Sequence, residues 1–224
     1  MAIAFVPGQN ATVKGPNNPP GGTVNLTLPG ASLPGNFYAL WVANGPATSV
    51  TDNASPPNTY QLIYFDTTWQ FGLYYSEDIS VPISGDTTLT VTQTDGGQMI
   101  LGIMEFSGVA LTSALDQSAH ADGSGSPLSS GNMTPSLNGE LIVAAITNPG
   151  GFGFAPGPGF TNLNEQNGFA WCDEYEVLTG GAGTPVAATA TFSVGGVTWG
   201  VIAATFKPAG ATQASNAIFD SMDF

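Results

Sequence analysis

Hydrophobic and polar residues alternate in short runs along this chain, without the roughly 3.6-residue period of an amphipathic helix. The alternation is clearest at 88–92 (TLTVT) and 186–192 (VAATATF), where every second side chain can face a core. Gly, Pro and Asn separate the runs, as they do at the turns of all-β proteins. The pattern therefore predicts an all-β fold with strands near 2–6, 23–28, 37–43, 59–65, 70–76, 87–93, 98–107, 113–121, 139–147, 158–163, 168–178, 185–194 and 197–207.

Four segments from the first part of the chain recur in the same order in the second part. The pairs are 39–43 with 140–144, 73–77 with 172–176, 87–92 with 186–192, and 99–106 with 199–206. Chance similarity between β-rich segments is the alternative, but the shared order favours two related halves, at 37–108 and 139–207. The last pair is apolar on both faces, which is typical of central strands that are covered on both sides.

These observations predict a single two-sheet β-sandwich of jelly-roll type, with extended N- and C-terminal arms. Both halves are expected to contribute to it, because four or five strands are few to bury a sheet face alone. Residues 1–22 would form an N-terminal arm with the first strand, 23–208 the sandwich, and 209–224 a C-terminal docking arm. The Ser- and Gly-rich stretch 118–135 is expected to be a surface excursion between the halves.

Several short motifs of the chain resemble one known module. They are LWVA at 40–43, the loop 49–60, Tyr74-Tyr75, 103–108, Leu115-Asp116 with Gly123 and Gly125, 139–143 and 159–161. Together they resemble, over roughly residues 37–207, an uncharacterised jelly-roll-like module of bacterial extracellular and phage-associated proteins. The resemblance implies a surface-exposed β-sandwich and brings no activity or catalytic residue with it.

The charge balance narrows the possible partners. Lys14 and Lys207 are the only basic residues beside sixteen carboxylates, and the formal net charge is -14. Nucleic-acid binding and attraction to an anionic membrane both need several cations, so neither is expected. No apolar run of about 18 residues predicts membrane insertion. The first seven residues lack a basic start, so we expect either prior removal of a signal peptide or release by another route, such as lysis.

Two groups of residues have the composition of metal sites. Asp116, His120 and Asp122 would share one face of an extended strand and offer carboxylate and imidazole ligands. Glu174 and Glu176 would also share a face and could bind Ca²⁺, or act as the acid and base of a glycosidase. The alternative for both groups is a solvated strand with scattered polar residues. No other cofactor is expected, and the single cysteine, Cys172, is interpreted as a core residue.

A ligand-binding loop is the second candidate. Asp52, Asn53 and Asn58 lie in a turn-forming segment with two prolines and could present amide and carboxylate groups to a glycan. Trp69 could supply the aromatic face that stacks on a sugar ring. The alternative is that the large aromatic residues belong to the core.

Apolar residues in loops and at the chain end suggest contacts with other subunits. Phe152 and Phe154 alternate with glycines in a loop, where they are hard to bury locally. The predicted docking arm follows a polar linker and carries Ile218, Phe219, Met222 and Phe224.

The favoured function is therefore that of a non-enzymatic structural protein of an assembly, on a virion surface or outside the cell. A phage-type virion component would fit, such as a capsid decoration, a fibre or a tail-associated subunit, which binds copies of itself or another particle subunit. No G-x-S-x-G elbow or phosphate loop points to an enzyme. The alternative function is a carbohydrate-binding or adhesin module of an extracellular protein.

Overall fold

The computed structural model describes residues 2–82, 84–166 and 170–210, and the described chain is all-β, as predicted. The first half contains β1 (Ala4–Asn18), β2 (Thr23–Thr27), β3 (Phe37–Ala43), β4 (Ala47–Asp52), β5 (Gln61–Asp66), β6 (Phe71–Ser76), β7 (Thr88–Gln93) and β8 (Gly97–Ser107). The second half contains β9 (Leu115–Ser124), β10 (Leu128–Ser129), β11 (Leu141–Thr147), β12 (Phe154–Pro156), β13 (Glu165–Gln166), β14 (Trp171–Val177), β15 (Thr189–Phe192) and β16 (Thr198–Phe206). Over these residues there is no helix long and apolar enough to cross a membrane.

Both halves have the same topology. In the first, a five-stranded sheet has the order β1-β8-β3-β6-β5, and a three-stranded sheet has the order β2-β7-β4. The second repeats this with β9-β16-β11-β14-β13 and β10-β15-β12. In each half the edge strand of the large sheet, β5 or β13, pairs with the strand that follows it in the chain, β6 or β14. The four recurring sequence segments fall on equivalent strands: β3 and β11, β6 and β14, β7 and β15, β8 and β16.

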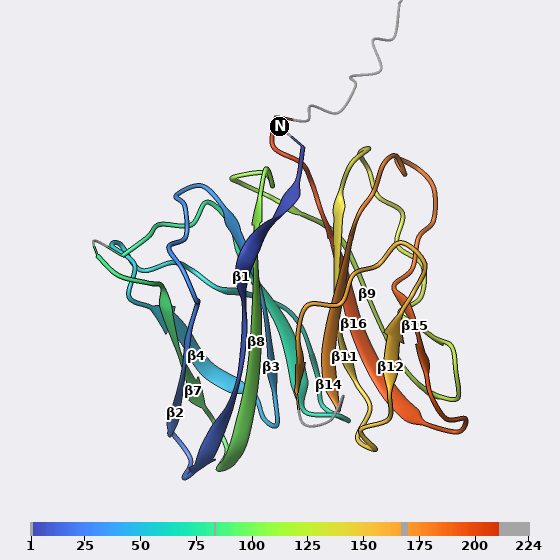
Figure 1. Cartoon of the computed structure of the whole chain (residues 1–224), viewed down its shortest axis with the longest axis horizontal. Coiled ribbons are helices and arrows are strands. Elements are labelled where there is room, and N and C mark those ends of the chain that lie inside the picture. The colour runs from blue at the N-terminus through green and yellow to red at the C-terminus, as the bar shows by residue number, and fades with distance from the viewer. Residues whose placement is uncertain (1, 83, 167–169, 211–224) are drawn as a thin grey trace, which may run out of the picture.

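The four sheets form four layers rather than the single two-sheet sandwich that was expected (Figure 1). The two five-stranded sheets face each other in the centre, and a three-stranded sheet covers the outer face of each. The doubly apolar strands explain this arrangement, because β3 and β11 are buried at every residue. A sheet that is apolar on both faces needs a layer on each side, so each half supplies its own outer sheet.

Among the described residues, three hydrophobic cores lie between the layers. The central core joins the halves, with Phe37, Trp41 and Phe71 from one side and Val143 and Phe206 from the other. The two outer cores each belong to one half. Cys172 is buried in the outer core of the second half, in agreement with its predicted role.

Two segments that were expected to be peripheral contain strands of the sheets, β1 and β9 in the central sheets and β10 in an outer one. β1 pairs with β8 from Ala4–Ser107 to Asn18–Gly97, so it is an integral strand rather than an arm. The expected excursion 118–135 holds most of β9 and all of β10, which pair with β16 and β15. The strand expected at 113–121 corresponds to most of β9, whereas the end of β9 and the two-residue β10 were not predicted.

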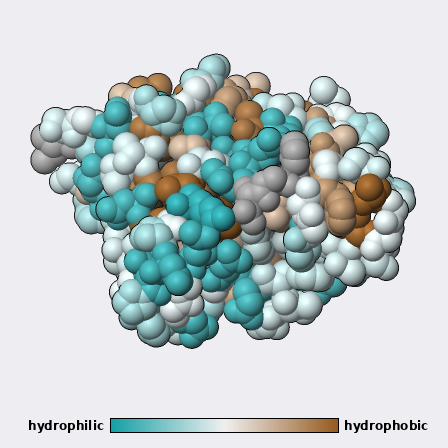
Figure 2. All heavy atoms as spheres, turned by 60° about the horizontal axis from the view of Figure 1, so that its bottom comes forward, coloured by the Kyte–Doolittle hydropathy of each residue, from teal (hydrophilic) through white to brown (hydrophobic). Residues whose placement is uncertain are grey.

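The face of the protein seen in Figure 2 is mostly polar. Figure 2, which turns the bottom of Figure 1 toward the viewer, shows hydrophilic residues with separated apolar areas between them. Figure 1 also shows that the start of β1 and the end of β16 lie together at the top of the molecule. We call this the exit end, and it is defined by Ser107, Gly108 and Ala209.

Candidate functional site

A β-bulge in β9 separates Asp116 from the other two residues of the first predicted metal group, His120 and Asp122. In the β9–β16 ladder Gln117 pairs with Thr205 and Leu115 pairs with Phe206, which leaves Asp116 as an extra residue. A bulge of this kind reverses the side on which the next side chain lies. Asp116 therefore contacts the second half, while His120 and Asp122 contact the first. Among residues 2–82, 84–166 and 170–210, no group of three or more His, Cys, Asp or Glu side chains is placed to hold a metal ion.

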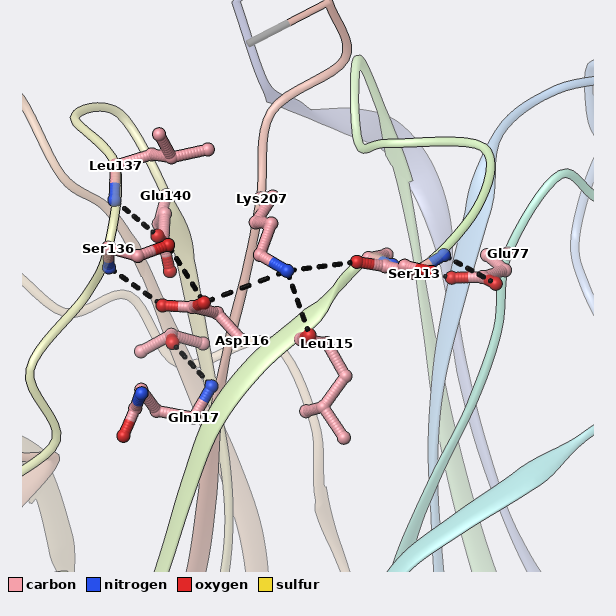
Figure 3. A network of polar contacts seen from close by, with 11 residues as sticks. Glu77, Ser113, Leu115, Asp116, Gln117, Ser136, Leu137, Glu140 and Lys207 are labelled. Carbon is pink, nitrogen blue, oxygen red and sulfur yellow. Dashed lines mark hydrogen bonds and ion pairs between the residues drawn. The ribbon is translucent and has the colours of Figure 1, made fainter. Parts of the chain in front are cut away.

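Asp116 belongs to a polar network close to the exit end (Figure 3). Its carboxylate accepts hydrogen bonds from the Ser136 backbone N–H at 2.7 Å and from the Ser136 hydroxyl at 2.8 Å. Lys207 Nζ lies 3.7 Å from Asp116 Oδ1 and donates to the Ser113 carbonyl at 3.2 Å. Burial, and secondarily the nearby Asp116, raises the pKa of Glu140 in the same network. The network ties β9, β16 and the 136–140 turn together.

His120 and Asp122 instead lie at the junction of the two halves. The His120 ring stacks on Tyr64 of β5, with centroids 3.6 Å apart. The Asp122 carboxyl lies beside Asp66, and the pKa of Asp122 is raised by burial first and by Asp66 second. Asp66 also accepts the Thr68 backbone N–H at 2.7 Å. The pair thus brings β5 of the first half against β9 of the second half.

Trp69, a predicted sugar-stacking residue, lies at the same junction and is partly buried. A methyl group on Gly200 of β16 would come within 2.4 Å of the Trp69 ring, so the indole rests directly on that strand. The other three tryptophans, Trp41, Trp171 and Trp199, are buried. The tryptophans therefore contribute chiefly to packing within and between the halves.

Glu174 and Glu176 share one face of β14, as the sequence predicted, and that face points into the second half. Glu174 is 0% exposed and accepts a hydrogen bond from the Gly157 N–H at 3.3 Å. Burial raises the pKa of Glu174 to about 8 and also raises the pKa of Glu176. Glu174 is therefore mainly protonated at neutral pH, which suits a core hydrogen bond better than an open calcium or acid–base site.

The neighbouring Asp173 points to the opposite face and joins the two halves. It accepts hydrogen bonds from Trp41 Nε1 at 2.9 Å, Asn164 Nδ2 at 2.7 Å, and the backbone N–H groups of Asn164 at 2.9 Å and Leu163 at 3.3 Å. Burial raises its pKa to about 6 against the lowering effect of these donors. Sequence inspection missed this contact because 132 residues separate Trp41 from Asp173.

The predicted ligand loop is held together by its own polar groups. Asp52 accepts hydrogen bonds from Asn58 Nδ2 at 2.8 Å and from the Tyr60 hydroxyl at 2.7 Å. Asn53 donates to the Asp86 carbonyl and accepts from the Thr88 N–H. Asn58 also bonds both backbone groups of Ser80. These side chains are committed to the shape of the loop, which is the use that an Asx-rich turn predicts.

An apolar hollow of about 300 Å³ lies at the exit end. Leu111 lies on its rim and is 48% exposed, while Leu33, next to the lining residue Pro34, is 60% exposed. The Ala209 N–H donates to the Gly108 carbonyl at 2.7 Å and holds the end of the described chain against the hollow. We call this feature the exit hollow; its lining residues are Pro34, Gly35, Asn36, Ser107, Gly108, Val109, Leu111 and Ala209.

The residues predicted to contact other subunits differ in how far they are buried, and some lie outside the described residues. Phe154 packs on the outer core of its own half. Phe152 is 38% exposed, and its ring lies over Gly150 of the same loop. Ile218, Phe219, Met222 and Phe224 lie outside the described residues. Sequence inspection did not single out Leu111, because one leucine among small and polar residues carries no periodic signal.

Comparisons with protein families and with curated proteins found no relative of this chain. No protein-family model matches the chain, and no curated protein matches it at a significant level. The resemblance to a jelly-roll-like module therefore stays a prediction, and the case for a function depends on the arrangement of the chain's own residues.

Proposed function

We propose that this protein is a non-enzymatic structural subunit that assembles through its exit end with copies of itself or with another particle subunit. The observation that carries the proposal is the exit hollow with the exposed Leu33 and Leu111 beside it. Large apolar side chains gathered around a concave surface are typical of protein–protein contacts. A phage-type virion component, such as a capsid decoration, fibre or tail-associated subunit, is the form of assembly that we favour.

Two further observations support a structural role over a catalytic or sugar-binding one. Three carboxylates that could contact a ligand each accept several hydrogen bonds within the fold; they are Asp52, Asp116 and Asp173. A group that already fills its hydrogen-bonding capacity loses those bonds when it turns to a ligand. In addition, the net charge of -14 opposes random association, so a stable assembly would need defined apolar contacts.

Light scattering after size-exclusion chromatography, over a range of concentrations, tests the proposal. The wild-type chain should form oligomers as its concentration rises, and Leu111→Asp should shift the midpoint of association to at least about tenfold higher concentration. Leu62→Asp is the matched control, because Leu62 on β5 is 50% exposed and lies away from the hollow. A 22.8 kDa monomer at every concentration and at physiological salt would contradict the proposal.

Glycan-array binding provides a second contradictory outcome. Reproducible binding that is lost in Asp52→Ala but kept in Leu111→Asp would favour the carbohydrate-binding alternative instead.

A further inference from the structure

We propose that the exit hollow receives residues 218–224 of a neighbouring copy of the chain. This inference rests on the proposed function, and it names the segment that would make the contact. The hollow is lined mainly by small and apolar groups, of which Val109, Pro34 and Leu111 provide the apolar surface. Such a site selects an apolar side chain over a charged one, because burial of an unpaired charge is costly.

The chain itself contains a segment with the matching composition. Fourteen residues, 211–224, follow the last described residue, and four of them are large and apolar: Ile218, Phe219, Met222 and Phe224. Their spacing within seven positions provides several anchors over a short distance, which a hollow of about 300 Å³ would accept one or two at a time. The remaining anchors would reach Leu33 and the rim.

The position of the chain exit makes the neighbour's segment the better occupant. Ala209 forms part of the wall of the hollow, so the chain's own segment would have to reverse direction to enter it. The same segment needs no such reversal to enter the hollow of a second copy, and the assembly proposed above supplies that copy.

Copies linked in this way would each donate one segment and accept another. The contact is heterologous, because residues 218–224 of one copy meet the exit hollow of the next. Such contacts close into a ring or continue as a lattice or fibre, depending on the rotation between copies. Each contact can be weak alone, since the assembly multiplies it.

Cysteine cross-linking between two different chains tests the inference directly. One chain carries Ser107→Cys in the wall of the hollow, and the other carries Ser221→Cys, which leaves the four apolar anchors intact. Under mild oxidation the mixture should give the mixed dimer at least about tenfold faster than a mixture of Ser193→Cys with Ser221→Cys. Ser193 is an exposed residue of the second half, and the native Cys172 is buried and should not react.

Each other outcome has a defined meaning. Equal cross-linking in the two mixtures would overturn the inference, as would no cross-linking at all. A double variant, Ser107→Cys with Ser221→Cys in one chain, that forms only cross-linked monomers would show that the chain's own segment fills the hollow, which also overturns it. Leu111→Asp could weaken association while the cysteine introduced at position 221 forms no disulfide with the one introduced at position 107. In that case the inference fails and the proposed function stands. A wild-type chain that stays monomeric at every concentration would overturn both the inference and the proposed function.

Discussion

Buried carboxyl groups are the main feature of this protein at the scale of single residues. Glu105, Glu140, Asp173 and Glu174 have no exposed surface, in a chain with only two basic residues. Without cations to pair with, a buried carboxyl must either accept several N–H groups or keep its proton. Asp173 is placed among four donors, whereas Glu174 has one. The two neighbours on β14 therefore use different means of tolerating the same burial.

We predict that Glu174→Gln changes the pH dependence of stability. The pKa of Glu174 is raised from 4.5 to about 8 in the folded state. The folded protein thus holds a proton that the unfolded chain releases, and its free energy of unfolding should fall as pH rises from about 4.5 to 8. Glutamine stays neutral, so the variant should gain roughly 4 kcal/mol relative to wild type between pH 5 and pH 9. Urea denaturation at pH 5, 7 and 9 measures this difference.

Glu165→Gln is the control for that experiment, because Glu165 lies on the adjacent β13 and is exposed. Parallel pH profiles for wild type and Glu174→Gln would show that Glu174 is ionised in the folded state at neutral pH and would refute the prediction.

A second prediction concerns the carboxylate that joins the halves. In Asp173→Asn, an NH₂ group replaces one oxygen and faces N–H donors in either orientation, because both carboxylate oxygens accept two of them. Leaving buried donors unpaired costs about 1–3 kcal/mol, so we expect a loss of about 2 kcal/mol at pH 7. Chemical denaturation measures it, with the exposed Asp95→Asn as the comparison. Equal stability of the two variants would mean that the contact contributes little.

At the scale of elements, the two halves keep the same strand order, but different residues make the equivalent contacts. Asn36, before β3, donates to Glu105 of β8 at 2.5 Å. At the equivalent places in the second half, Glu140 precedes β11 and Thr205 lies on β16, and these two side chains are again neighbours. The carboxyl group thus lies on β8 in the first half and just before β11 in the second, while the contact between the two positions is kept. This supports an equivalence of structure between the halves that sequence identity alone would not indicate.

Close contact between adjacent strands leads to a third prediction. Trp41 of β3 pairs with Gly102 of β8, and a Cβ atom on Gly102 would lie 2.2 Å from the indole. Gly102→Ala should therefore displace Trp41 from the central core and lower the free energy of unfolding by about 3 kcal/mol. Gly195→Ala should be nearly neutral, because no atom lies within 4 Å of the added methyl group. Thermal unfolding of both variants measures this, and similar melting temperatures would argue against the packing.

Most long strands were predictable from the sequence, but several short ones were not. Alternation and apolar runs identified β3, β6, β7, β8, β11 and β16, because burial of a face imposes a pattern. β4 is mostly polar and β10 has only two residues, and neither was predicted. The expected strand at 158–163 is a loop, with β12 and β13 on either side of it. Short edge strands form when a neighbour offers its hydrogen bonds, so local sequence indicates them weakly.

For the whole molecule, the central core predicts one cooperative unfolding transition. Phe37, Trp41, Val143 and Phe206 belong to different halves but to the same core, so separation of the halves would expose it to water. Differential scanning calorimetry should give a single peak whose van't Hoff and calorimetric enthalpies agree. Hydrogen exchange in β3 and β11 should then respond equally to denaturant. Two resolved peaks would show instead that each half folds independently.

The sequence by itself determined the all-β class, the order of the repeat and the double burial of the central strands. These features follow from local periodicity, which the backbone of a strand imposes on any sequence that it buries. Only the tertiary structure decided that four sheets form, that a bulge turns Asp116 away from His120 and Asp122, and that Asp66 meets Asp122. It also gathered Pro34, Val109 and Ala209 around one hollow. Such contacts join residues far apart in the chain, and no local pattern encodes which distant surface will cover them.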